Sequence, residues 1–277
     1  MDERRVETTI NGRKTMKILV IMGSPRKGNT FRACEEFREL LQQECAAEFE
    51  YLWLKDAHLL PCKGCLSCFS RGEDTCPNRD DVPALEQKMR EADAVVFASP
   101  VYGFNVTGLM KTFIDRFSYF FHRPRFFDKK AFVLATAGVM GLNDVLSYLE
   151  KVAGLWGFEV VGTAGLIMTN DNPTRSLAEK NKKILKKAAK EFSTALQRNK
   201  RKSPGIMDVI IFHSVRAAFS QLERVSPFDY QYWKNKGWFS PGVRYFVDIP
   251  VNPLFLAAGR IAGWLTLRQV RKNTTLE

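Results

Sequence analysis

The chain has 277 residues, 45% of them hydrophobic and 26% charged, which is ordinary for a soluble globular protein and allows one domain, or one domain plus an extension. The net charge is +12, but 13 Lys and Arg stand against 5 Asp and Glu from Arg198 to the end, so most of the excess lies there. No nucleic-acid motif accompanies this charge, so we expect no nucleic-acid partner, whereas an acidic partner or a peripheral membrane contact stays open.

Five short apolar runs alternate with five segments of helical spacing between residues 17 and 198. The predicted strands are Lys17–Met22, Phe49–Leu54, Ala94–Ser99, Ala131–Thr136 and Phe158–Thr163. The predicted helices are Thr30–Glu44, Val82–Glu91, Thr107–Phe120, Leu142–Leu155 and Thr174–Arg198. This alternation predicts an α/β fold with a parallel sheet covered on both faces. Such sheets bind ligands at the carboxyl ends of their strands.

The loop after the first predicted strand has the composition of a phosphate site. It reads Gly23-Ser24-Pro25-Arg26-Lys27-Gly28-Asn29-Thr30 and leads into a helix. Small residues let the backbone approach a phosphate, and a helix N-terminus offers N–H groups and a positive dipole end. The loop matches neither the dinucleotide nor the nucleoside-triphosphate glycine pattern. It therefore predicts a site for one terminal phosphate, the alternative being an ordinary strand–helix turn.

Two further loops follow strands of the same predicted sheet. Ser99–Thr107 contains Pro100 and Gly103, which favour a tight turn, and two aromatic side chains, Tyr102 and Phe104, that offer apolar surface to a planar ring. The loop Ala137–Gly141 follows the next strand and contains two glycines. Because parallel strands end at one edge of the sheet, the three loops predict the walls of one flavin site. The alternative is that the aromatic residues anchor the loop in the core.

Four cysteines lie within fifteen residues with the spacing C-x2-C-x2-C-x7-C; they are Cys62, Cys65, Cys68 and Cys76. A short loop of this kind can turn three thiolates toward one centre, and Pro77 follows the last cysteine as in the bacterial ferredoxin pattern. We therefore expect a [4Fe-4S] cluster. Zinc stays open as an alternative, although structural zinc sites usually combine two ligand pairs with C-x2-4-C or H-x3-5-H spacing. A redox-active loop without metal is the third interpretation. We expect Asp80-Asp81 to cap the next helix.

Together these motifs resemble the iron–sulfur flavoprotein branch of the NADPH-dependent FMN reductase family, which has a flavodoxin-like fold with strand order 2-1-3-4-5. The resemblance covers Met16 to Arg198 and includes a helix with Lys111 and Ile114-Asp115-Arg116. It implies a cluster on the four cysteines and FMN at the three loops, with the phosphate near Ser24. The FMN-binding residues would be Ser24, Arg26, Gly28, Asn29, Thr30, Pro100, Val101, Tyr102, Gly103, Phe104, Asn105, Ala137 and Gly138.

The resemblance implies an FMN-dependent oxidoreductase that passes electrons between FMN and the cluster. The donor would be NAD(P)H or a ferredoxin, and a small redox substrate is a further partner; the catalytic residues stay unknown. Members of the family are commonly homodimers or homotetramers in which a neighbouring subunit completes the flavin site. The alternative function is a non-catalytic interaction protein with a flavodoxin-like scaffold and a zinc-stapled loop.

The expected domains are a flavodoxin-like domain over residues 16–198, with the cysteine loop at 58–81, and a basic, aromatic-rich extension over 199–277. The aromatic rings of the extension would pack together, form an interface with another subunit or redox partner, or dock on a membrane. No apolar stretch follows the N-terminal Met-Asp-Glu-Arg-Arg, so we expect no secretory signal. Six cysteines in such a chain should be reduced, which favours ligands over disulfides and a cytoplasmic location.

Overall fold

A computed structural model describes residues 9–10, 13–169 and 173–273. The chain forms two compact units, each made of two segments. Unit 1 contains Met1–Cys62 and Asp80–Asn199, and unit 2 contains Lys63–Arg79 and Lys200–Glu277. The domain boundary between residues 198 and 199 remains a prediction. The last four residues of the predicted extension, 274–277, lie outside the described part.

Unit 1 contains a five-stranded parallel sheet with the order β4-β3-β5-β6-β7. Its strands are β3 (Met16–Met22), β4 (Ala47–Trp53), β5 (Ala94–Pro100), β6 (Lys130–Ala137) and β7 (Glu159–Ile167). Each corresponds to one predicted strand, and counted along the chain their order is 2-1-3-4-5, so the predicted fold class is confirmed. A short antiparallel pair, β1 (Thr9–Ile10) and β2 (Arg13–Lys14), precedes the sheet.

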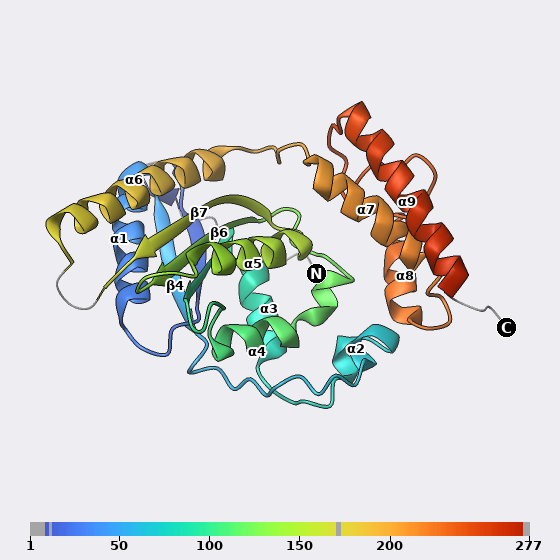
Figure 1. The fold of residues 1–277 in the computed structure, drawn as a ribbon, viewed down its shortest axis with the longest axis horizontal. Helices are drawn as coiled ribbons and strands as arrows, with labels where there is room; N and C mark the ends of the chain where they lie inside the picture. The colour runs from blue at the N-terminus through green and yellow to red at the C-terminus, as the bar shows by residue number, and fades with distance from the viewer. Residues whose placement is uncertain (1–8, 11–12, 170–172, 274–277) are drawn as a thin grey trace. The chain divides into compact units, whose positions relative to one another are not determined.

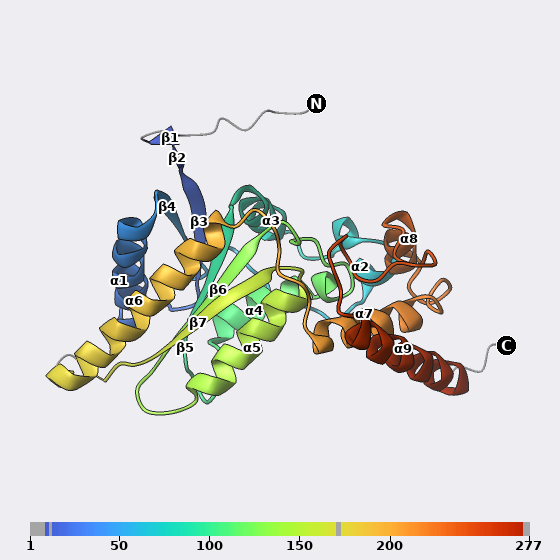
Figure 2. The same ribbon diagram turned by 90° about the horizontal axis from the view of Figure 1, so that it is seen from above.

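Helices cover both faces of this sheet (Figures 1 and 2). On one face lie α1 (Asn29–Glu44) and α6 (Arg175–Gln197), whose apolar stripes pack on alternate residues of the strands. On the other lie α3 (Val82–Glu91), α4 (Gly108–Arg116) and α5 (Leu142–Leu155). The central strands β3, β5 and β6 are largely buried on both sides and consist of nearly continuous apolar runs, whereas the edge strand β4 alternates apolar residues with exposed glutamates.

The second face is filled mainly by aromatic rings. Phe97 from β5 makes edge contacts with Trp156 and Phe158, and Phe126 stacks on Phe158 with ring centroids 4.4 Å apart. Phe117 separates α4 from a 3-10 turn, η2 (Ser118–Phe121), so the single helix predicted over 107–120 is in fact two elements. The chain between them turns so that this ring becomes fully buried.

Unit 2 contains three helices from the extension and two short turns from the cysteine loop. The helices are α7 (Ile206–Phe219), α8 (Pro227–Asn235) and α9 (Pro253–Asn273), and the turns are α2 (Ser67–Ser70) and η1 (Glu73–Thr75). Trp233 of α8 is fully buried and contacts Phe212 and Phe219 of α7. Many aromatic rings of the extension therefore pack on one another. No helix in the described part of the chain is long and apolar enough to cross a membrane.

Candidate functional site

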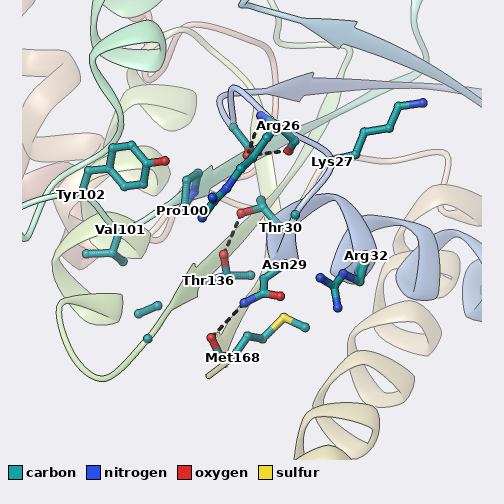
Figure 3. A pocket seen from close by; sticks show the side chains of 14 residues that line it. Arg26, Lys27, Asn29, Thr30, Arg32, Pro100, Val101, Tyr102, Thr136 and Met168 are labelled. Carbon is teal, nitrogen blue, oxygen red and sulfur yellow. Dashed lines mark hydrogen bonds between the residues drawn. The ribbon is translucent and has the colours of Figure 1, made fainter. Parts of the chain in front are cut away.

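A cavity of about 450 Å³ lies in unit 1 at the carboxyl ends of its strands (Figure 3). This volume is typical of a site for a small molecule or cofactor. Ten of the residues predicted to bind FMN, all from the three loops, line the cavity: Ser24, Arg26, Gly28, Asn29, Thr30, Pro100, Val101, Tyr102, Ala137 and Gly138. Since these residues are far apart in the sequence, the parallel sheet is what brings them together.

One end of the cavity is the N-terminus of α1. The N-cap residue is Gly28, which has no side chain with which to cap the first N–H groups of the helix. Three cationic side chains, Arg26, Lys27 and Arg32, line this end, and none of the described lining residues is acidic. Figure 3 shows Lys27 directed away from the other side chains of the loop. The positive end of the helix dipole, together with Arg26 and Arg32, suits an anion.

Hydrogen bonds fix the loop around this helix end. The Ser24 hydroxyl donates to the carbonyl of Arg26 over 2.9 Å, which closes the turn. The hydroxyl groups of Thr30 and Thr136 lie 2.7 Å apart and are buried, so α1 is tied to the end of β6. Asn29 donates its side-chain N–H to the carbonyl of Met168 over 3.0 Å. These bonds hold the loop rigid next to the cavity.

The second loop is a tight turn closed by two backbone hydrogen bonds between Tyr102 and Asn105. Gly103 and Phe104 at its tip have φ values of 53° and 63°, in the left-handed region that favours glycine. The predicted residues Gly103, Phe104 and Asn105 lie on this turn but not in the lining of the cavity. Behind it, Thr107 caps α4 and donates its hydroxyl to the Gly23 carbonyl, which joins the first two loops.

Four residues that line the cavity were not predicted: Lys27, Arg32, Thr136 and Met168. Thr136 is a polar residue at the end of an apolar strand, and Met168 directly follows the fifth strand at the same edge of the sheet. Position at a strand end is thus the signal that identifies both. The two cations lie in a loop and first helical turn that the phosphate pattern already marked.

The base of the cysteine loop is closed by two carboxylates in unit 1. Asp80 accepts the N–H of Leu60 over 3.0 Å, and Asp81 accepts the N–H of His58 over 2.7 Å. Arg116 donates two hydrogen bonds to Asp80, and both of these side chains are almost fully buried. Burial alone would raise the pKa of Asp80, but the bonds from Arg116 and Leu60 hold it below its ordinary value. Asp81 does occupy the predicted N-cap position of α3, but its side chain makes no capping bond, so the cap prediction is wrong for this carboxylate; the Asp80 carboxylate instead accepts the backbone N–H of Val82, the first residue of the helix.

None of the four cysteines forms a disulfide: Cys62 and Cys65 are exposed, and Cys68 and Cys76 are half-buried. Hydrogen bonds from the side chain and backbone of Ser67 hold the pKa of Cys65 below its ordinary value. Within the described residues no three Cys, His, Asp or Glu side chains come close enough to hold one metal ion. The donor set, four thiols outside any disulfide, fits a cluster or zinc in its chemistry. The cluster remains a prediction.

Comparison with known proteins adds independent findings. A model of the NADPH-dependent FMN reductase family matches residues 16–173. An iron–sulfur flavoprotein of Archaeoglobus fulgidus is 32% identical over 231 residues, which cover 80% of this chain and 100% of that protein. An iron–sulfur flavoprotein of Clostridioides difficile is 28% identical over 218 residues, covering 76% of this chain and 94% of that protein.

Among solved structures, the NAD(P)H:quinone oxidoreductase from Methanothermobacter marburgensis superposes with a TM-score of 0.52 at 20% sequence identity. The match covers 64% of this chain and 97% of that chain. At this identity the likeness concerns the fold, and it agrees with the parallel sheet of unit 1.

Proposed function

Because the chain belongs to the NADPH-dependent FMN reductase family, in its iron–sulfur flavoprotein branch, we propose that it passes electrons between FMN and a [4Fe-4S] cluster. The family makes it an FMN-dependent oxidoreductase. FMN would occupy the cavity of unit 1, and Cys62, Cys65, Cys68 and Cys76 would hold the cluster. The electron donor would be NAD(P)H or a ferredoxin.

The observation that carries the FMN assignment is the cationic, uncapped N-terminus of α1 at one end of the cavity. FMN has one terminal phosphate, and this end offers backbone N–H groups, the Thr30 hydroxyl and the Arg26 guanidinium, on a loop whose turn Ser24 closes. The loop around Pro100 and Tyr102 would line the ring. Loops that bind a pyrophosphate carry the dinucleotide glycine pattern, which lets the backbone approach both phosphates, and this loop does not match that pattern.

When bound, FMN takes up electrons as a pair and can release them singly, whereas a cluster carries one electron at a time, so together they link two kinds of redox partner. This chain's own part is to bind the phosphate, orient the ring and hold the cysteines. No acid or base is needed for that step, and we assign none.

We further propose that a second copy of the chain covers the open side of the cavity. Four apolar side chains on the second and third loops of unit 1 are largely exposed: Tyr102, Phe104, Val139 and Met140. Exposed apolar groups gathered near a site favour an interface. A Val139→Ser, Met140→Ser variant should lower the oligomeric state in analytical ultracentrifugation and weaken FMN binding. An unchanged oligomer would contradict this part.

The function is tested on full-length protein purified without oxygen. We expect about one FMN, about four irons and matching acid-labile sulfide per chain, with absorbance that bleaches on reduction by NAD(P)H or dithionite. Zinc in place of iron, with FMN still bound, would refute the cluster and favour the zinc-stapled alternative. Protein with neither flavin nor iron would refute the proposal as a whole.

A further inference from the structure

The turn between the last two cysteines belongs structurally to the C-terminal extension. Residues 63–79 and 200–277, more than 120 positions apart in the sequence, form one compact unit. We refer to residues 65–76 as the cysteine turn; it contains three of the four cysteines together with α2 and η1. Its nearest helix in the extension is α8.

Local hydrogen bonds shape the cysteine turn, and each of them closes only a short turn. Thr75 donates its hydroxyl to the carbonyl of Gly72 over 2.7 Å, and Arg71 donates to the Ser67 hydroxyl over 3.1 Å. One helical turn is far below the length at which a helix is stable alone. Packing on another part of the chain would therefore add to the order that these local bonds provide.

Two contacts from α8 supply that packing. The Ser226 hydroxyl lies 3.0 Å from the Phe69 carbonyl and 2.8 Å from the carboxylate of Asp229, which is fully buried. The Phe228 ring rests against Gly72, because a Cβ at this glycine would lie only 2.8 Å from its Cζ atom. Gly72 also has a φ of 99°, which side-chain residues rarely adopt. Both the close approach of the Phe228 ring and the positive φ therefore require glycine at this position.

The helix that makes these contacts is itself firmly anchored. Trp233, on the same helix, is fully buried and contacts Phe212, Phe219 and Trp238. A continuous path of packed groups therefore runs from the aromatic core of the extension through α8 to the cysteine turn. Two of the seven residues between Cys68 and Cys76, Phe69 and Gly72, make these contacts.

We propose that the C-terminal extension fixes the position of the cysteine turn, and we call the contacts of Ser226 and Phe228 with this turn the holder. Ser226 and Phe228 are then positioning residues for Cys65, Cys68 and Cys76. The consequence for bound iron rests on the proposed function. The holder itself does not, because it consists of contacts within unit 2. Every residue that lines the flavin cavity lies in unit 1, so disturbing the holder should leave FMN binding unchanged.

Two substitutions add one group to the same contact from opposite sides. Gly72→Ala adds a methyl facing the ring, and Phe228→Tyr adds an oxygen at Cζ, the ring atom closest to Gly72. Gly242→Ala is the matched control for the first: its φ of 87° imposes similar backbone strain, but nothing lies within 4 Å of the added Cβ. The double variant Gly72→Ala, Phe228→Ala tests whether removing the ring relieves the added methyl.

The measurements are amide hydrogen exchange over residues 67–76 and, in anaerobic protein, the rate at which a chelator removes iron. Gly72→Ala and Phe228→Tyr should each raise exchange by about tenfold, a change of about 1.4 kcal/mol. Gly242→Ala should leave exchange there within about twofold. In the double variant, exchange should be slower than in Gly72→Ala alone. Iron loss should follow the same ranking, with unchanged FMN per chain.

Equal exchange over 67–76 in Gly72→Ala and Gly242→Ala would overturn the proposal. It would also be overturned if the effects of Gly72→Ala and Phe228→Ala on exchange simply added in the double variant. Wild-type protein without iron would refute the cluster but not the holder, which the exchange measurements then decide alone. Phe228→Ala, which only removes atoms, should also raise exchange, and it provides a variant should Gly72→Ala not fold.

Discussion

Replacing Arg26 by glutamine should weaken the binding of FMN but not of riboflavin. The two ligands differ only in the terminal phosphate, and Arg26 is the cation of the first loop that lies at the cavity beside Pro100 (Figure 3). The substitution removes one positive charge and keeps a side chain of similar length. Any effect on the ring site or on folding would appear equally with riboflavin.

The size of the effect follows from the exposure of the guanidinium. A hydrogen bond to a charged group contributes about 1.5–3 kcal/mol, and Arg26 is exposed, so solvent screening places it at the lower end. Since about 1.4 kcal/mol corresponds to tenfold in affinity, the Kd for FMN should rise about tenfold. The difference should shrink as salt is added, because the two charges are close to solvent.

Lys27→Gln is the matched control. It removes the same charge from the next residue, but the Lys27 ammonium lies 5.6 Å over the Phe31 ring and is directed away from the loop. Titrations of flavin-free protein with FMN and riboflavin, followed by flavin fluorescence, should give less than a threefold change in Kd for this variant, as expected for a screened surface charge. Equal losses for both ligands in Arg26→Gln, or equal losses in both variants, would refute the phosphate assignment.

Three other changes give further tests. Cys65→Ser should abolish iron binding and keep FMN, because a hydroxyl is a poor ligand where iron requires thiolate; metal analysis with full iron would show that the ligand set is wrong. Thr30→Val should lower the free energy of unfolding by about 1 kcal/mol, since it takes the partner from a buried hydroxyl on β6, as urea denaturation can measure. Burial, with Arg216 and Arg260 nearby, holds the pKa of His213 below its ordinary value. The unfolded chain then binds more protons than the folded chain, so the free energy of unfolding should fall as the pH drops through the ordinary histidine range. In thermal melts, His213→Asn should make the melting temperature less dependent on pH over this range.

The sheet and the cavity could be predicted because their signals are local. Buried parallel strands such as Ala94–Pro100 are apolar in nearly every residue, and loops at their carboxyl ends must meet at one edge. The contribution of Met168 was missed because no motif marks it; only the strand order places it next to Asn29. The role of Asp81 was misjudged for a similar reason. Its capping position is visible in the sequence, but its bond to His58 spans 23 residues.

The helices of the extension were harder to predict. Helix α7 is apolar on most of its surface, and α9 contains two glycines, Gly259 and Gly263, that would weaken an isolated helix. In the fold these glycines let α9 approach α7 closely, since a Cβ at either position would lie within 2.8 Å of His213. Tertiary packing thus determines these elements where local propensity is weak.

The two sites that we propose depend on different kinds of support. The cavity is made by short loops at the ends of strands that are buried on both faces, so its shape follows from the fold of unit 1. The cysteine loop has no such framework, because residues 58–66, all of them described, form neither helix nor strand. It is fixed instead by the Asp80 and Asp81 bonds at its base and by α8 at the cysteine turn. An extension that is remote in sequence therefore matters for the cysteines, while the flavin cavity has its own support.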